Sequence, residues 1–317
     1  MTIRESSLKS ILGVCVNQGY YGNNDLLRAC RDIGFNWVRI SASHDLVEPT
    51  KGQYDWAWLD AAVNEWLELS GGFPPFLSLY GIPKWISPLA GSFDVNYVPY
   101  WSDFVNAITE RYWYLPDWGV TCETNIKGGM KQSKEEFMEY VLIPAALAIH
   151  DHGKRVIATG TTCQWWESRD TRDRARRHFS YFYEHGEGFI DKHDFHSYGT
   201  SGKSVCLQNM NFMYDQLGGR YPNLGELWCT ETGFSNSRDG VPRDYTGDAM
   251  LHKYQNYIPW LWKHGGWFER VFLYRAWDGA QPLIHRNGIL DTDFRLGPSA
   301  LYLKEELAKI IEVPNEN

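Results

Sequence analysis

The chain has 317 residues, 31 basic and 39 acidic side chains giving a net charge of −8, and 15 tryptophans and 19 tyrosines. This length suits one large α/β domain, and no Pro/Ser-rich linker divides it, so a single domain over residues 1–317 is expected. The acidic balance argues against nucleic-acid binding, because the one basic cluster, at 169–177, alternates with acidic residues as a solvated helix face does.

No apolar run approaches the ~20 residues that cross a membrane, so no membrane association is expected. The apolar run at 11–16 is too short for a secretion signal, and no small-residue cleavage site follows it. The protein is expected either in the cytoplasm or as a secreted protein whose signal has been removed. The six cysteines show no CxxC spacing, which favours buried thiols over disulfides or a zinc site.

Short apolar strands alternate with amphipathic helices along the chain. Strands are expected at 11–17, 35–41, 75–80, a stretch ending at Glu123, 155–161, 189–198, a stretch ending at Glu231, and 270–277. The expected helices include 101–112, one opened by a capping box at 133–136, one holding residues 207–217, 248–264 and 298–311. This alternation predicts an α/β protein with the (β/α)8 TIM-barrel fold. A doubly wound sheet would alternate likewise, but the sequence has neither a GxGxxG nor a GxxxxGK[ST] loop.

Polar residues lie where the predicted strands end, at the face where such barrels carry active sites. Two of them are glutamates after buried strands, Glu123 and Glu231, and a carboxylate is costly in apolar surroundings unless it is paired or used. The other residues expected at this face, as substrate-binding groups, are Arg39, His44, Trp85, Asn125, Trp165, His196, Tyr198 and Trp277. Each alone could be structural, as a counter-ion, a core histidine or a packing ring. Together they indicate a functional site.

Glycoside hydrolysis requires this kind of set, because one carboxylic acid protonates the leaving oxygen while a carboxylate attacks the anomeric carbon or activates water. Arg39 beside Glu231 would keep the attacking carboxylate ionised. The many aromatic rings also fit a cleft in which sugar faces stack.

The chain resembles the retaining β-glycosidases of glycoside hydrolase clan A, nearest to families 39 and 5. The resemblance covers essentially the whole chain and rests on Arg39, residues 47–60, Pro83-Lys84-Trp85, His196-Ser197-Tyr198, Thr230-Glu231-Thr232-Gly233 and Trp277. It implies that Glu123 is the acid/base and Glu231 the nucleophile, with an oligo- or polysaccharide substrate and no cofactor or metal.

The chain departs from the clan at Cys122, where the usual residue is an asparagine that binds the sugar 2-hydroxyl. Asn125 is a candidate substitute. This departure leaves open a catalytically weakened carbohydrate-binding barrel. A metal-dependent barrel hydrolase also stays open, although its usual His-x-His at the end of the first strand is replaced by Cys15-Val16-Asn17. Connections at the active face look short, which favours an open cleft and endo cleavage. The sequence fixes neither the sugar nor the oligomeric state.

Overall fold

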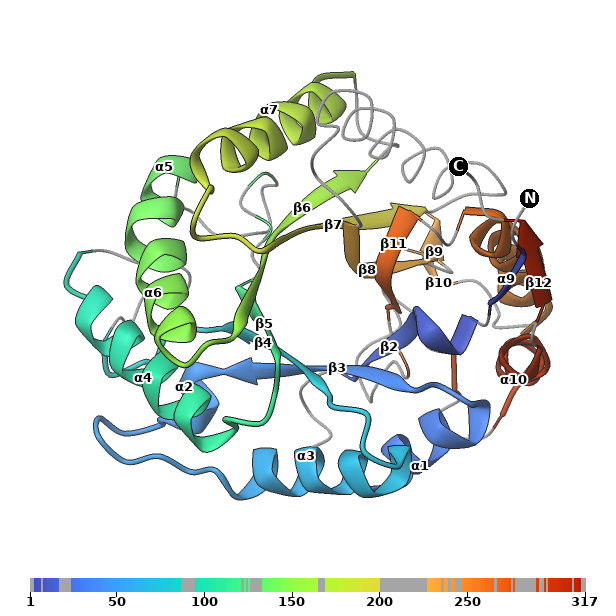
Figure 1. Ribbon diagram of the computed structural model, residues 1–317, viewed down its shortest axis with the longest axis horizontal. Coiled ribbons are helices and arrows are strands. Elements are labelled where there is room, and N and C mark those ends of the chain that lie inside the picture. The colour runs from blue at the N-terminus through green and yellow to red at the C-terminus, as the bar shows by residue number, and fades with distance from the viewer. Residues whose placement is uncertain are drawn as a thin grey trace.

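Eight parallel strands close into a barrel in the computed structural model (Figure 1). They are β2 (Leu12–Val16), β3 (Trp37–Ser43), β4 (Phe76–Tyr80), β5 (Asp117–Val120), β6 (Arg155–Gln164), β7 (Lys192–Gly199), β8 (Leu227–Phe234) and β11 (Phe268–Leu273). β11 pairs with both β2 and β8, which completes the ring. The predicted (β/α)8 fold is confirmed.

The structure describes residues 3–6, 8–16, 24–86, 95–120, 123, 125, 133–164, 169–199, 227–234, 237–238, 241–242, 247–264, 267–274, 276, 289–290, 294, 296–309 and 311–314. The helix expected around 207–217 lies outside these residues.

Helices surround the barrel (Figure 1). They are α1 (Asn24–Ile33), α2 (His44–Val47), α3 (Ala57–Ser70), α4 (Val98–Arg111), α5 (Lys134–Phe137), the π-helix Met138–Leu142, α6 (Ile143–Asp151), α7 (Arg169–His185), α9 (Gly247–His264) and α10 (Pro298–Ala308). A short 3₁₀ helix, Leu8–Ser10, precedes β2. The predicted capping box is present: Ser133 Oγ accepts from the Glu136 amide at 3.1 Å, and Glu136 Oε2 accepts from the Ser133 amide at 2.9 Å.

Several predicted boundaries differ from the structure, and three of them concern the glutamates and the last helix. Glu231 does not end its strand, since β8 continues to Phe234, and Glu123 follows β5 after two intervening residues. The last helix stops at Ala308 and is followed by β12 (Ile311–Pro314), which pairs antiparallel with β1 (Ile3–Ser6). No local pattern indicates that pairing, because its two strands lie at opposite ends of the chain.

The barrel interior is closed by a buried cluster of Cys15, Phe76, Ile157, Trp228 and Phe272. Two glycines make room for these rings. A Cβ on Gly13 would lie 2.8 Å from the Phe272 ring, and one on Gly119 would lie 2.7 Å from the Phe76 ring. The filled interior leaves the ends of the strands as the place for chemistry.

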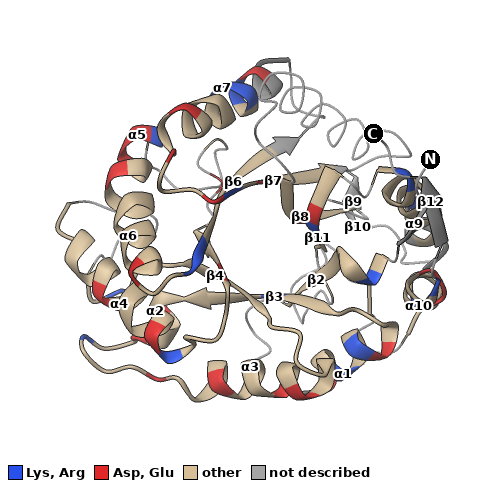
Figure 2. Cartoon of the chain, in the orientation of Figure 1, with Lys and Arg blue, Asp and Glu red and all other residues tan. Residues whose placement is uncertain are grey.

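Acidic and basic residues are interspersed along the outer helices (Figure 2). At the strand starts, Arg155 bonds Asp117 at 2.6 Å and Glu269 at 2.9 Å, and Lys192 lies 3.2 Å from Glu269. The thiols of Cys15, Cys30 and Cys229 are buried, as expected, and none of these three forms a disulfide. Of the helices described, none combines the length and the apolar character needed to cross a membrane.

Candidate active site

Glu231 lies at the centre of a group of side chains from four strands. Arg39 of β3 donates from Nη1 to Glu231 Oε1, and Tyr198 of β7 donates its hydroxyl to Oε2. Arg39 Nη2 also donates to Ser78 Oγ of β4 at 3.1 Å. The side chains of Arg39 and Glu231 are only 6% and 14% exposed. A buried arginine–glutamate pair is therefore held by contacts from several directions.

The surroundings of Glu231 favour its ionised form. Burial alone would raise the pKa of this carboxyl, but the charges of His196 and Arg39 and the hydrogen bond from Tyr198 outweigh burial and hold the pKa below its ordinary value. The same ion pair raises the pKa of Arg39 despite the burial of its guanidinium. Glu231 is thus an anion at neutral pH, as a nucleophile must be.

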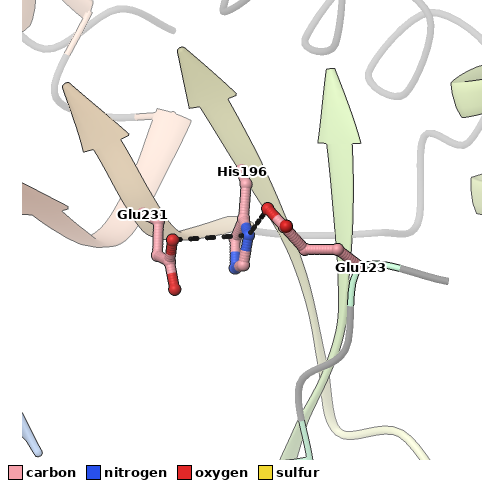
Figure 3. A group of neighbouring side chains, drawn as sticks. All are labelled: Glu123, His196 and Glu231. Atoms are coloured by element: carbon pink, nitrogen blue, oxygen red, sulfur yellow. Dashed lines mark hydrogen bonds and ion pairs between the residues drawn. The ribbon is translucent and has the colours of Figure 1, made fainter. Parts of the chain in front are cut away.

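Glu123 lies on the other side of His196 (Figure 3). Its Oε1 accepts from Thr162 Oγ1 of β6 at 2.7 Å and lies 2.8 Å from His196 Nδ1. Its side chain is 28% exposed, twice the fraction of Glu231. One carboxylate oxygen of Glu123 is therefore hydrogen-bonded to β6, and the Glu123 side chain is more exposed than that of Glu231.

The two glutamates approach each other closely across His196. One carboxylate oxygen of Glu123, one of Glu231 and a ring nitrogen of His196 all lie within 4.8 Å of one another. His196 Nδ1 is 3.7 Å from Glu231 Oε2 (Figure 3). The structure thus brings the predicted pair of carboxylates together at one end of the barrel.

Among the residues that the structure describes, the same three side chains form the group that could surround a metal ion. A cation there would stand against the guanidinium of Arg39, which already balances the charge of Glu231. His196 Nδ1 already bonds Glu123. The contacts therefore fit a hydrogen-bonded acid–base cluster better than a metal centre.

Asn125 reaches the site indirectly. Its amide nitrogen donates to the Thr162 carbonyl at 2.6 Å, and its amide oxygen accepts from the Thr162 amide at 2.9 Å. The residue is 5% exposed, so both polar ends of its side chain are used inside the protein. Asn125 holds the backbone of β6 where Thr162 supports Glu123, instead of facing open space as a substrate-binding group would.

His44 lies apart from the glutamates. Its ring is fully buried, with Nδ1 2.7 Å from Tyr97 Oη, Nε2 2.7 Å from Glu48 Oε2, and the Phe104 ring stacked at 4.2 Å. Burial lowers the pKa of His44 to about 4 despite the contact with Glu48. This placement corrects the prediction for His44, because a ring with no exposed surface offers no face to a substrate.

Trp85 is half-buried beside Glu48, the residue that His44 contacts. Its indole nitrogen donates to the Glu48 carbonyl at 2.8 Å, and its ring meets Tyr100 edge-on at 5.3 Å. Three other residues of the sequence argument, Trp165, Trp277 and Cys122, lie outside the described residues.

Sequence reasoning missed three residues that support the cluster: Thr162, Asp194 and Thr230. Asp194 had a signal, since it precedes His196 by two positions and so shares its strand face. Thr162 had no such signal and Thr230 entered only as part of the motif around Glu231, because the direction of both side chains depends on irregularities in β6 and β8 where the pairing register shifts.

No family model and no curated protein matches the sequence. Solved structures do match it. A family 39 glycoside hydrolase from the gut symbiont Bacteroides cellulosilyticus WH2 aligns with a TM-score of 0.63 at 18% identity, over 95% of this chain and 64% of that one. A monomeric β-xylosidase from Caulobacter crescentus CB15 aligns with a TM-score of 0.69 at 17% identity, over 98% and 71%. Xylanase 10B from Thermotoga maritima aligns with a TM-score of 0.64 at 12% identity, over 94% and 95%.

The fold is that of the glycoside hydrolase barrels. The resemblance expected from the sequence is confirmed for the fold. With sequence identities of 12% to 18%, the solved structures show the fold alone. The chain spans slightly less than two thirds of the family 39 enzyme, so that enzyme's activity is not transferred to it.

Proposed function

We propose that residues 1–317 form one catalytic barrel and that the protein is a retaining β-glycoside hydrolase acting on an oligo- or polysaccharide without a cofactor. The observation that carries the proposal is the approach of the two carboxylates, whose nearer oxygens lie within 4.8 Å. Carboxyl groups are about 5–5.5 Å apart in retaining enzymes and about 6.5–9.5 Å apart in inverting ones, which need room for a water. The short separation supports direct attack.

In the first step Glu123 gives its proton to the leaving oxygen while Glu231 attacks the anomeric carbon. The bond from that carbon to the leaving oxygen breaks, and an ester bond to a Glu231 oxygen forms. Arg39 and Tyr198 support this role, since both donate to the carboxylate that attacks.

In the second step a water gives a proton to the Glu123 carboxylate and its oxygen attacks the anomeric carbon. The ester bond breaks and returns Glu231 as a carboxylate. Two inversions leave the β configuration unchanged. The greater exposure of Glu123 supports its role, because this residue must meet both the leaving group and the water.

Endo cleavage is expected from the sequence because the connections at the active face look short. The connection between β4 and α4 runs from 81 to 97, and the one between β8 and α9 carries a small hairpin of β9 (Ser237–Arg238) and β10 (Val241–Pro242). These connections are longer than expected, so they weaken that support. The lengths of the products from a polysaccharide panel decide between endo and exo action.

The deciding experiment is the stereochemistry of hydrolysis. We expect proton NMR of the first products from an aryl β-glycoside to show the β anomer before mutarotation. A 2-deoxy-2-fluoro glycoside of the same sugar should add its glycosyl mass to the peptide that contains Glu231. An α anomer as the first product would remove Glu231 as nucleophile and recast it as a base.

The second candidate is the catalytically weakened carbohydrate-binding barrel suggested by Cys122. Sugar-binding titrations on the same panel distinguish it from the retaining hydrolase. Binding of glycans without turnover of any activated aryl glycoside would favour that candidate. Loss of activity in Glu231→Gln fits both the retaining and the inverting mechanism, so this variant alone decides nothing.

A further inference from the structure

Asp194 is a fully buried carboxylate that the proposed reaction does not use. It lies on β7 between two places where the neighbouring strands lose register. In β6 the pairing shifts between Ala158 and Thr161, and in β8 Thr230 is the extra residue between the partners of Phe195 and His196. Bulges of this kind turn a side chain out of the regular alternation and are frequent next to active sites.

Both irregularities supply a donor to Asp194. The amide of Gly160, whose φ of 64° is one that glycine adopts readily, donates to Oδ1 at 2.6 Å, and the hydroxyl of Thr230 donates to Oδ2. Burial raises the pKa of Asp194, while the charge of His196 and these two donors oppose that shift. The hydrogen bonds from Gly160 and Thr230 use both oxygens of Asp194 as acceptors beneath the site.

The contacts continue from Thr230 to the proposed acid/base. Thr230 Oγ1 lies 3.1 Å from His196 Nε2, and His196 Nδ1 lies 2.8 Å from Glu123 Oε1. A hydroxyl has one hydrogen to donate. Because Thr230 gives that hydrogen to Asp194, it can only accept from His196, and Nε2 must carry a hydrogen.

We propose that Asp194 and Thr230 are positioning residues that fix His196 as its Nε2–H tautomer and thereby aim the Nδ1 acceptor at Glu123. The catalytic part of this inference rests on the proposed function, whereas the tautomer does not. When the ring is neutral and Glu123 holds its proton, Nδ1 accepts the hydrogen bond of the carboxylic acid. Once the proton has gone to the leaving group, the Nδ1 lone pair faces a carboxylate, which makes Glu123 a better base toward water.

Several charged groups face His196 besides Asp194. They are Glu123, Glu231 and Arg39, and the ring of Tyr198 lies 6.4 Å away. Burial opposes the imidazolium, but the charge of Glu231 and the bond to Glu123 raise the pKa of His196 on balance. In the imidazolium Nε2–H still donates to Thr230, so the exchangeable proton lies between Nδ1 and Glu123 in both charge states.

The first test reads the tautomer directly by ¹⁵N NMR of histidine-labelled protein, with the His196 signals assigned by their loss in His196→Gln. At a pH high enough for the ring to be neutral, we expect the wild type to carry hydrogen on Nε2 and none on Nδ1, and Thr230→Ser, which keeps the hydroxyl, to do the same. In Thr230→Val the acceptor is gone, and the ring should move toward the Nδ1–H form that donates to Glu123. Hydrogen on Nδ1 alone in the neutral ring of the wild type would overturn the proposal.

Asp194→Asn reverses the direction of the chain of contacts. The asparagine oxygen still accepts from Gly160, while its amide nitrogen donates to Thr230, which must then donate to Nε2. We expect this variant to hold the Nδ1–H form more completely than Thr230→Val does. If the buried substitution prevents folding, Thr230→Val alone carries the test, since it changes only a hydroxyl to a methyl.

The second test is the pH dependence of kcat/KM on the best aryl β-glycoside of the panel. Thr230→Val should move the basic limb about one unit to lower pH, because one hydrogen bond of ordinary strength now favours ionised Glu123. Thr232→Val is the matched control, since it removes a hydroxyl of the same strand that bonds Tyr257 at 3.2 Å.

If the basic limb of the pH profile does not move in Thr230→Val, or moves by the same amount in Thr232→Val, then Asp194 and Thr230 do not position His196. Wild-type protein that hydrolyses no glycoside but shows the Nε2–H form would instead refute the proposed function and leave the tautomer standing. The two failures are thereby distinguished.

Discussion

Arg39 and Glu231 lie 192 positions apart in the chain and form a buried ion pair inside the barrel. Their strands, β3 and β8, are not neighbours, since β2 and β11 stand between them in the ring. Arg39 also bonds Ser78 on β4. One guanidinium therefore fixes the proposed nucleophile against strands from both halves of the chain.

The first prediction concerns this pair. Arg39→Ala should move the acid limb of the pH–rate profile to higher pH, because the pKa of Glu231 rises when the neighbouring positive charge is lost. The measurement is kcat/KM against pH on an aryl glycoside, with circular dichroism to confirm the fold.

Arg111→Ala is the control for Arg39→Ala, since Arg111 pairs with Asp60 at the surface, where the side chains are 41% and 31% exposed. Breaking a buried pair costs about 3–5 kcal/mol of stability, so Arg39→Gln, which also removes the positive charge but keeps more of the side chain, serves if the alanine variant unfolds. An acid limb that stays in place in a folded variant would show that Arg39 does not set the ionisation of Glu231.

The second prediction concerns Glu123. Glu123→Ala should lower turnover of substrates with poor leaving groups by about 10²–10⁴-fold, the usual contribution of general acid catalysis, and should affect activated aryl glycosides much less in the glycosylation step. Azide should restore turnover and give a β-glycosyl azide, because it attacks the intermediate without needing a base. Equal losses on both substrates with no effect of azide would contradict the assignment.

The third prediction concerns metals. Incubation with a chelator followed by gel filtration should leave kcat unchanged, because Arg39 already balances the charge of Glu231 and His196 bonds Glu123. Elemental analysis of the purified protein provides the second measurement. Activity that is lost with the chelator and returns with one divalent metal would favour the metal-dependent hydrolase.

The fourth prediction concerns acid stability. Burial lowers the pKa of His44 to about 4 and that of His178 to about 3, against 6.5 for an exposed histidine. The unfolded chain therefore binds more protons than the folded one below pH 6.5. The stabilisation from each buried neutral ring is complete above that pH and is lost as the pH falls toward the folded value, by about 1.4 kcal/mol per pH unit for each ring.

Urea unfolding between pH 7 and 5 measures this loss of free energy of unfolding. In His178→Leu we expect the slope against pH to fall by about one proton. A slope that is the same in wild type and His178→Leu would show that His178 is not neutral in the folded protein. The raised pKa of His196 acts in the opposite direction and is common to both proteins.

Much of this architecture was readable from local sequence. Most barrel strands contain a short apolar run and most helices a helical period, so their alternation predicted the barrel. The glutamates were found because a carboxylate after a buried run is costly. His44 was misplaced because it begins the short helix α2 directly after β3, and that turn carries its ring into the layer with Tyr97 and Phe104.

The rest depends on contacts between distant segments. Thr230 would share no face with Glu231 in a regular strand, and only the shifted register between β7 and β8 brings both to His196. The partners of Asp194 come from β6 and β8, so its use as an acceptor cannot be seen in its own strand. A sequence pattern with a period of two predicts a regular strand, so it does not reveal where the pairing register shifts.

The aromatic rings that fill the barrel interior beneath the site affect the order of steps in the proposed reaction. Phe76, Trp228 and Phe272 fill the interior below Arg39, and Cys15 contacts that arginine at 3.7 Å. These buried rings lie beneath the site, so in the proposed reaction the water of the second step would enter through the mouth that the leaving group occupied. We infer that departure of the first product precedes entry of water. An acceptor sugar waiting at the mouth would compete with that water for the glycosyl group, and transglycosylation should increase with acceptor concentration.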